Sequence, residues 1–174
     1  MGLEQLLQRE RARVGVEMGP TRWREVLQND INEFGRCTYD PDPMHIDPEW
    51  ARLHSPFKHT IAFGFWTLSM LSSLLYELSG LAPDSAPRPE GLIGINYGCD
   101  RLRFIEPVPV GSRIRARGKL VSIEQPEPDR LRRVTDVTVE IEGKEKPALT
   151  ARWLSFSLLP EATGSLSGFR KKDT

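Results

Sequence analysis

The chain has 174 residues, of which 39% are apolar and 28% are charged. This length allows one domain with a substantial core, and the apolar content is too high for wholesale disorder. Lysine plus arginine and aspartate plus glutamate number 24 each, which argues against a nucleic-acid-binding protein, because such proteins need a net or clustered positive field.

The sequence also bears on the compartment in which the protein works. Cys37 and Cys99 belong to no CxxC pair, so reduced thiols fit them best. Residues 1–15 lack the apolar core of a signal peptide, and no apolar run approaches the ~18 residues of a transmembrane helix. These features predict a cytoplasmic protein that does not bind membranes.

The beginning of the chain is predicted to be mostly helical. Residues 3–13 are amphipathic, which predicts a helical N-terminal extension over residues 1–19. Residues 21–27 read as a short strand and residues 29–38 as a helix. Residues 48–54 begin with proline and glutamate, a typical helix start.

The strongest helical signal covers residues 64–80. Apolar side chains recur there every three or four positions, at Phe65, Leu68, Leu71, Leu75 and Leu78. The apolar arc is broad, so we expect this helix to be central, and Gly80 is a natural stop for it. The proline-rich residues 81–91 are predicted to form a loop.

The second half of the chain carries strand signals. Four strands are expected, over residues 92–105, 112–124, 132–142 and 147–159, with turns at 124–130 and 142–147. Basic and apolar residues alternate over 113–120, as on a strand with one solvated face; an attraction for a phosphate-bearing small molecule is the alternative. Residues 161–174 are rich in Gly, Ser and Lys and are predicted to be a flexible tail. Antiparallel strands after one long apolar helix predict an α+β fold with the helix laid on a sheet.

The stretch "YDPDPMHID", residues 39–47, concentrates three aspartates and a histidine. A calcium loop starting at Asp40 would need Gly at its sixth position and Glu at its twelfth, but those positions hold His45 and Ala51. "HID" matches the His-x-Asp half of an iron triad without a convincing third ligand. We therefore expect no metal here. The chain also lacks a GxSxG nucleophile motif.

Acid/base chemistry is the remaining chemical interpretation of this stretch. Asn29 and Asp30 supply capping side chains for the preceding helix, and Pro41 is expected to stop it, which places Asp40 at the helix exit. A proline turn between Asp40 and His45 can bring both side chains to one water, where one group accepts a proton and the other delivers one. The alternative is an ordinary polar turn with a structural histidine.

Gly64 adds a second component to this hypothesis. It lies where an extended segment enters the central helix, so its backbone N–H would point outward with the helix dipole behind it. Such an N–H suits an oxyanion or a polarised carbonyl, and glycine permits close approach of a substrate. The alternative is that Gly64 only relieves crowding against the sheet.

Three segments in this order resemble the MaoC-like dehydratase family of hot-dog-fold proteins, which includes the (R)-specific enoyl-CoA hydratases. They are "YDPDPMHIDPEWA", "TIAFGFWTLS" and "INYGCDRLRFIEPVPVG", and the resemblance covers roughly residues 20–160. The resemblance implies a single hot-dog domain over residues 1–160, in which a curved antiparallel sheet wraps a long central helix. It also implies a homodimer, or a higher homo-oligomer built from dimers, joined through sheet edges.

The function that the resemblance implies is reversible hydration of a trans-2-enoyl-CoA to an (R)-3-hydroxyacyl-CoA. Asp40 and His45 match the family's catalytic dyad and the Gly64 amide matches its thioester-oxygen donor. Coenzyme A enters as part of the substrate, and no other cofactor is expected. A hot-dog thioesterase and a non-catalytic acyl-CoA-binding or assembly subunit remain as alternatives.

Four further residues are candidates for substrate binding. Tyr39 and Phe63 stand where the family usually has Gly and His, and their bulk would reshape an acyl pocket. Asn96 and Arg101 belong to the third matching segment, and Arg101 could meet a phosphate or lie on a solvated strand face. Asp42 replaces the family's usual Asn and would add a negative charge beside the dyad, which would raise the dyad's proton affinities; no other role follows for it from the sequence.

Overall fold

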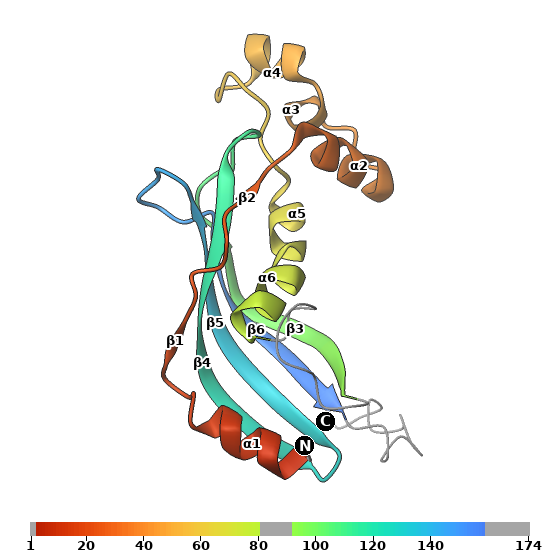
Figure 1. Ribbon diagram of the computed structural model, residues 1–174. Coiled ribbons are helices and arrows are strands. Elements are labelled where there is room, and N and C mark those ends of the chain that lie inside the picture. Colours follow the sequence, from red (N-terminus) through yellow and green to blue (C-terminus); the bar gives the residue numbers. More distant parts are fainter. Residues whose placement is uncertain (1–2, 81–91, 159–174) are drawn as a thin grey trace.

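The computed structural model describes residues 3–80 and 92–158. The loop expected at residues 81–91 and the tail expected at 161–174 lie outside this part of the chain. The described residues form a curved antiparallel sheet with helices on its concave face (Figure 1). This is the α+β architecture expected from the sequence.

The sheet contains the four strands predicted for the second half of the chain and two short strands from the first half. Their bounds are β1 Glu17–Met18, β2 Arg24–Glu25, β3 Ile93–Phe104, β4 Arg113–Glu127, β5 Arg130–Ile141 and β6 Leu149–Leu158. The order is β1-β4-β5-β6-β3, with β2 also paired to β4, and every pairing is antiparallel. The turn predicted over residues 124–130 is shorter than expected, because Glu127 and Arg130 still pair across it.

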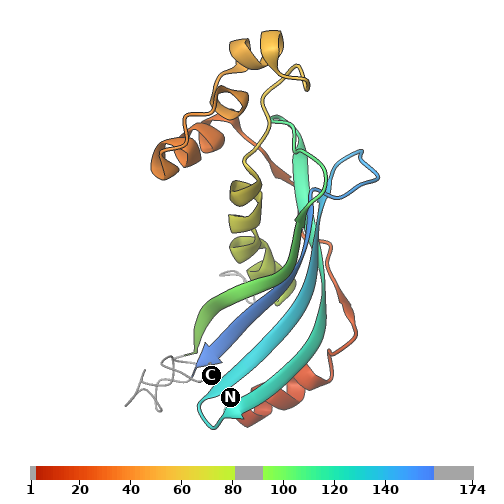
Figure 2. The same ribbon diagram turned by 180° about the vertical axis from the view of Figure 1, so that it is seen from behind.

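The helices are α1 Leu3–Arg11, α2 Gln28–Thr38, α3 Pro43–Ile46, α4 Pro48–His54, α5 Gly64–Ser69 and α6 Leu71–Leu78. The single helix predicted over residues 64–80 is therefore two consecutive segments that meet at Met70. The Ser69 hydroxyl donates to the Phe65 carbonyl at 2.7 Å, a back-bond of the kind that bends helices. The two segments follow each other along the concave face of the sheet, as both views show (Figures 1 and 2).

The main apolar cluster fixes the central helix pair on the sheet. Trp66 of α5 and Leu71 of α6 belong to the same buried cluster as Val137 and Val139 of β5. Full burial of one such side chain contributes about 1.5–3 kcal/mol relative to leaving it exposed. The broad apolar arc of residues 64–80 therefore packs against the concave face of the sheet, and this helix pair is central, as predicted.

A second apolar cluster holds the N-terminal helix. Leu6 and Leu7 of α1 are buried together with Ile123 of β4 and Leu131 of β5. These contacts join segments more than a hundred residues apart in the sequence, so α1 is packed on the sheet and is part of the folded domain. The helical N-terminal extension expected over residues 1–19 is thus shorter as a helix, and its second half contributes the strand β1.

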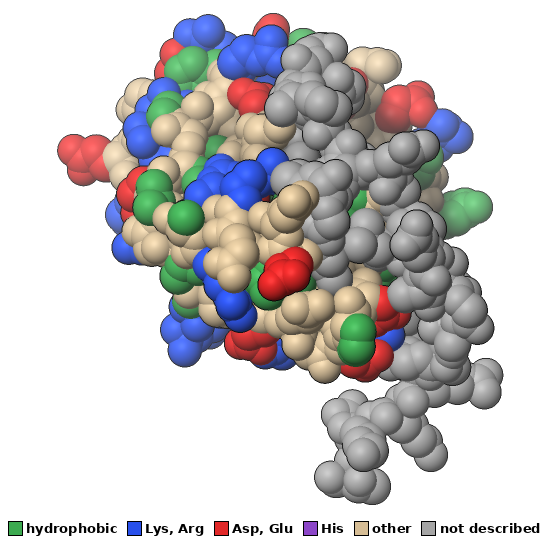
Figure 3. Space-filling model, turned by 60° about the horizontal axis from the view of Figure 1, so that its bottom comes forward, with side chains coloured by type: hydrophobic (Ala, Val, Ile, Leu, Met, Phe, Trp, Pro, Cys, Tyr) green, Lys and Arg blue, Asp and Glu red, His purple; other side chains and the backbone are tan. Residues whose placement is uncertain are grey.

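The outer face of the sheet carries paired charges. The basic stripe on β4 alternates with buried side chains, so its interpretation as one solvent-facing side of a strand is confirmed. Arg115 and Arg117 both donate to Glu140 of β5, at 2.6 and 2.8 Å. Figure 3 shows the molecule with the bottom of Figure 1 turned forward, and there too basic and acidic side chains lie interspersed among apolar and other ones.

The segment from α2 to α4 gathers at one end of the sheet, above the start of α5 in Figure 1. This places the charged stretch 39–47 beside the first residue of the central helix pair. Among the helices of the described residues, none is long and apolar enough to cross a membrane.

Candidate active site

The end of α2 sets the position of Asp40. Tyr39 is the C-cap of α2 in the left-handed conformation (φ 57°), so the helix ends at Thr38, three residues before Pro41. The Asp40 N–H donates to the Gly35 carbonyl at 2.9 Å. Gly35 is buried, and a Cβ there would lie 2.9 Å from the Asp40 carbonyl oxygen. The helix exit predicted for Asp40 is confirmed. The capping predicted for Asn29 and Asp30 is wrong, because Leu27 occupies the N-cap without a side-chain bond.

The other two aspartates of the stretch begin helices. Asp42 is the N-cap of α3 and its carboxylate accepts from the Met44 N–H at 2.9 Å. Asp47 is the N-cap of α4 and accepts from the Trp50 N–H at 2.9 Å. These caps satisfy backbone donors that would otherwise be orphaned, and they give Asp42 a structural role that the sequence had not suggested.

Gln28 connects the turn that contains His45 to the segment that leads into α5 through two hydrogen bonds. Its side-chain amide donates to the His45 carbonyl at 2.8 Å, and its amide oxygen accepts from the Thr60 hydroxyl at 2.5 Å. The Ile61 N–H also donates to the Met44 carbonyl at 3.3 Å. The backbone around His45 is thus fixed from both sides.

The imidazole of His45 is oriented by a hydrogen bond and by a ring contact. Its Nδ1 lies 2.7 Å from the Ile61 carbonyl oxygen. Because a carbonyl only accepts, Nδ1 carries the proton in this arrangement, and Nε2 of the neutral ring is left with a lone pair. The Phe63 ring lies 3.9 Å from the imidazole, centroid to centroid. This geometry makes His45 a suitable general base.

His45 and Gly64 line the same pocket, which has a volume of about 290 Å³. Gly64 is the first residue of α5, as predicted, so its N–H is among those that a helix cannot satisfy internally. The ring of Phe104 covers Gly64 closely, since a Cβ there would lie 3.1 Å from it. The other residues of this pocket are Ile61, Ala62, Thr67, Ile105, Glu106, Pro107, Val108 and Ala148.

Asp40 lies in a neighbouring hollow instead. That hollow is lined by Tyr39, which is 93% exposed, and by residues of α2. The Asp40 carboxylate accepts from the Asp42 N–H at 3.2 Å. The structure therefore brings His45 and Gly64 together in one pocket, and it places Asp40 next to that pocket rather than in it.

The remaining substrate-binding candidates are separated. Phe63 is only 5% exposed and packs between His45 and Phe34, so it supports the imidazole more than it presents a surface. Asn96 on β3 donates to the Ser72 hydroxyl at 3.2 Å and lines a pocket farther along α6. Arg101 is exposed at an irregularity of β3, with φ 54°.

Sequence reasoning missed several residues of the site. Thr67 follows Gly64 by almost one helical turn, a spacing that could have indicated it. Glu106 lies just after the end of β3, the Gln28 side chain binds backbone and hydroxyl groups of distant residues, and Gly35 acts by lacking a side chain, so no pattern marked them. Within residues 3–80 and 92–158, no three His, Cys, Asp or Glu side chains gather closely enough to hold a metal ion.

Comparisons with known proteins agree with these observations. The family model described as "MaoC like domain" matches residues 10–143. Nodulation protein N of Rhizobium leguminosarum bv. viciae is 42% identical over 144 residues, covering 83% of this chain and 86% of that protein. The 3-hydroxyacyl-thioester dehydratase Z of Mycobacterium tuberculosis is 38% identical over 143 residues, covering 80% and 87%. The structure of the (R)-hydratase from A. caviae involved in PHA biosynthesis superposes with a TM-score of 0.64 at 21% identity, covering 84% and 96%, which confirms the hot-dog fold.

Proposed function

The chain belongs to the MaoC-like domain family, and from this premise we propose that it catalyses the reversible hydration of a trans-2-enoyl-CoA to an (R)-3-hydroxyacyl-CoA. The family and the dehydratase relative support a hydratase or dehydratase in general terms. The observation that carries the finer proposal is the common pocket of His45 and Gly64, with the imidazole held so that Nε2 can accept a proton.

The reaction needs a base for water and a donor for the thioester oxygen. In the proposed mechanism Nε2 of His45 takes a proton from water as the oxygen adds to the β-carbon of the enoyl group. Negative charge then develops on the thioester oxygen, and the Gly64 N–H stabilises it there. Asp40, at the edge of the site, acts in its protonated form and delivers that proton to the α-carbon. The imidazolium of His45 then returns its proton to the Asp40 carboxylate through solvent, so that both groups are restored.

The contribution of each group has an expected size. A positioned acid or base typically contributes about 10²–10⁴-fold, and one oxyanion donor about 2.7–4 kcal/mol of barrier. His45 is inside the pocket and fixed by Ile61, whereas Asp40 must reach the substrate from the neighbouring hollow. We therefore expect His45 to be the more sensitive of the two residues.

The test is a hydration assay with enoyl-CoAs of varied length, in which loss of the conjugated double bond is followed by absorbance. We expect His45→Gln to lower kcat by about 10²–10⁴-fold and Asp40→Asn to lower it measurably. His54→Gln is the matched control, because His54 is an exposed histidine at the end of α4. Equal activity of the wild type and both variants would refute the proposed roles.

A hot-dog thioesterase is the second candidate, and the position of Asp40 outside the His45 pocket is the observation that favours it. Hydrolysis would need the base and the oxygen donor without a second proton carrier. Release of free thiol from acyl-CoA, with no change in the double bond of an enoyl-CoA, would establish this candidate. Tight acyl-CoA binding without any turnover would instead indicate a non-catalytic subunit.

We also propose that the protein forms a homodimer through β3. This strand lies at the edge of the sheet, pairs only with β6 among the described strands, and is 12 residues long. Ile93, Tyr97 and Phe104 on it are large, apolar and exposed. A long apolar edge is a site for pairing with another strand, so a second copy of β3 would satisfy it.

A further inference from the structure

A second pocket lies between α6 and the concave face of the sheet, at the end away from Gly64. Its volume is about 120 Å³. Its wall is mostly apolar and includes Leu75, Leu120, Trp153 and Phe156. From Gly64 to Leu78 the two helical segments advance by about 21 Å, at roughly 1.5 Å per residue, so this pocket lies a long acyl chain away from the Gly64 amide.

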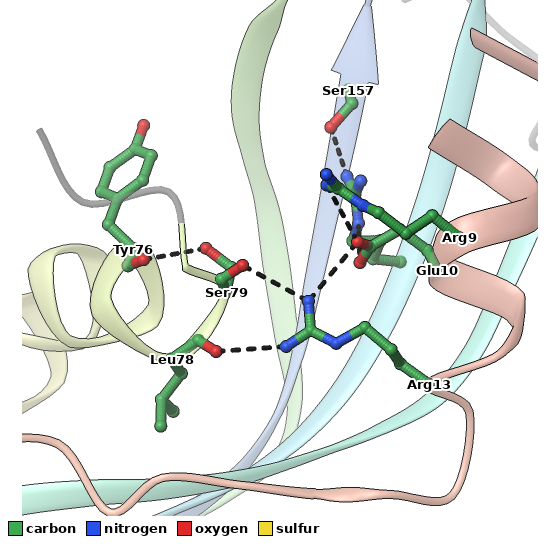
Figure 4. A network of polar contacts seen from close by, with 8 residues as sticks. Arg9, Glu10, Arg13, Tyr76, Leu78, Ser79 and Ser157 are labelled. Carbon is green, nitrogen blue, oxygen red and sulfur yellow. Dashed lines mark hydrogen bonds and ion pairs between the residues drawn. The ribbon is translucent and has the colours of Figure 1, made fainter. Parts of the chain in front are cut away.

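Charged residues line one side of this pocket, and Figure 4 labels two of them, Glu10 and Arg13. Glu10 from α1 is only 8% exposed, and Arg133 from β5 is 14% exposed. Arg13, which follows α1, donates to the carbonyls of Leu78 and Ser79 at 3.4 and 3.3 Å, and so closes the end of α6. Three parts of the chain thus meet here: the α1 region and β5 at the Glu10 carboxylate, and the end of α6 at Arg13.

Among residues 3–80 and 92–158, the positive charge of this group exceeds its negative charge. Arg9, Arg13 and Arg133 all contact the carboxylate of Glu10, at 3.3, 3.5 and 3.5 Å. These distances are longer than the ~2.7–2.9 Å of a strong charge-assisted hydrogen bond. One carboxylate therefore faces three guanidinium groups, of which Arg9 is the most solvated, at 42% exposure.

Arg133 is the most confined of these cations. Burial lowers the pKa of its guanidinium, and Glu10 is the anion that opposes this effect, while Arg9 and Arg13 add to it. Its Nη1 donates to the hydroxyl of Ser157, which is itself buried. A buried cation costs less when an anion completes its pairing, so a further carboxylate beside Arg133 would be stabilised.

We propose that this pocket holds the far end of an acyl group that terminates in a carboxylate, with the hydrocarbon against Leu75 and Trp153 and the carboxylate at Arg13 and Arg133. This inference rests on the proposed function, because it names the class of acyl thioester that the His45 pocket would process. The preferred substrates are then long enoyl-CoAs with a carboxylate at the ω-end rather than a methyl group.

The alternative is that the same residues have a purely structural role, in which they hold α1 and α6 together. The two roles differ in the effect of Glu10. If the cluster is only structural, loss of any of its residues lowers the stability of the fold and leaves the preference between charged and uncharged ligands unchanged. If the pocket binds a carboxylate, Glu10 competes with that carboxylate for the arginines, and its neutralisation strengthens binding.

Two measurements test the proposal on the full chain. The first compares kcat/KM for an ω-carboxy-enoyl-CoA and for the methyl-terminated enoyl-CoA of the same length. The second uses calorimetry to compare binding of a free long-chain fatty acid and of its methyl ester, which carries no charge. The second measurement stands even if the chain hydrates no enoyl-CoA, so failure of this inference and failure of the proposed function can be distinguished.

We expect the wild type to prefer the charged ligand in both measurements. Arg133→Gln should reduce that preference by about tenfold or more, which is the effect of one hydrogen bond to a charged group. Glu10→Gln should increase the affinity for the fatty acid several-fold. Arg132→Gln is the control, since Arg132 lies next to Arg133 in β5 but on the opposite face, where it pairs with Glu124.

Three results would overturn the proposal. They are a wild type with no preference for the charged ligand, a folded Arg133→Gln variant with an unchanged preference, and a Glu10→Gln variant that is less stable but binds no better. If Arg133→Gln does not fold, Arg13→Gln replaces it, because Arg13 contacts the same carboxylate from a loop outside the sheet.

Discussion

Gly35 offers the sharpest test of how the helix exit positions Asp40. A Cβ at this position would lie 2.9 Å from the Asp40 carbonyl oxygen and 3.1 Å from both Ile46 Cγ2 and Phe63 Cζ. The first neighbour is backbone and cannot rotate away, and Phe63 is itself packed against His45. Gly35→Ala must therefore shift the Asp40 turn, the His45 support, or both.

Two opposing effects determine the stability of Gly35→Ala. Replacing glycine by alanine inside a helix gains about 0.8–1.0 kcal/mol of helix propensity. Forcing an extra methyl group into a packed site costs typically about 1–3 kcal/mol. The net expectation is a loss of about 1 kcal/mol, which corresponds to a fall in Tm of about 2–4 °C for a chain of this size.

Thermal unfolding and enoyl-CoA hydration are measured together on Gly35→Ala. We expect a lower Tm and a loss of activity larger than the loss of stability explains, because the displaced groups are those of the site. Cys37→Ala is the control, since Cys37 is exposed on the same helix and its replacement should not lower Tm. A raised Tm with full activity in Gly35→Ala would show that the steric reasoning is wrong.

Three further predictions rest on particular contacts. Asp42→Ala should cost about 1 kcal/mol by removing the N-cap of α3, whereas Asp42→Asn should retain most of the stability, as chemical denaturation can show. The hydrogen bond from Arg152 lowers the pKa of the Asp136 carboxylate, so this pair stabilises the fold above the unfolded pKa near 4 and the effect is lost as pH falls through the lower folded pKa. The Tm difference between wild type and Asp136→Asn should accordingly shrink in acid, and a difference that stays constant down to pH ~2 would contradict the assignment. Tyr97→Lys on the edge of β3 should shift a dimer toward monomer in sedimentation, while Val16→Lys, also at an exposed position, should not.

Much of the fold could be predicted because its signals are local. In β4 and β5 buried residues alternate with more accessible ones, which is the two-residue period of a strand, and the apolar recurrence over residues 64–80 indicates a central helix. The bend at Met70 escaped prediction because it accompanies a hydrogen bond from the Ser69 hydroxyl to the Phe65 carbonyl, and the sequence does not show that this bond forms. The turn between β4 and β5 was placed too wide because Glu124, Glu127 and Arg130 look polar and loop-like, although they pair across the hairpin.

The sequence by itself determined the order of the chemical groups: an aspartate after a helix, a histidine in the next turn and a glycine at the start of the central helix. These follow from helix stops, caps and spacing, which act over a few residues. Only the tertiary structure decided which groups share a pocket. Phe63 stacks on His45, Asp40 lies in the neighbouring hollow, and Glu10 meets Arg133 across more than a hundred residues of sequence. Such contacts arise from packing between distant segments, and packing leaves no local pattern in a sequence.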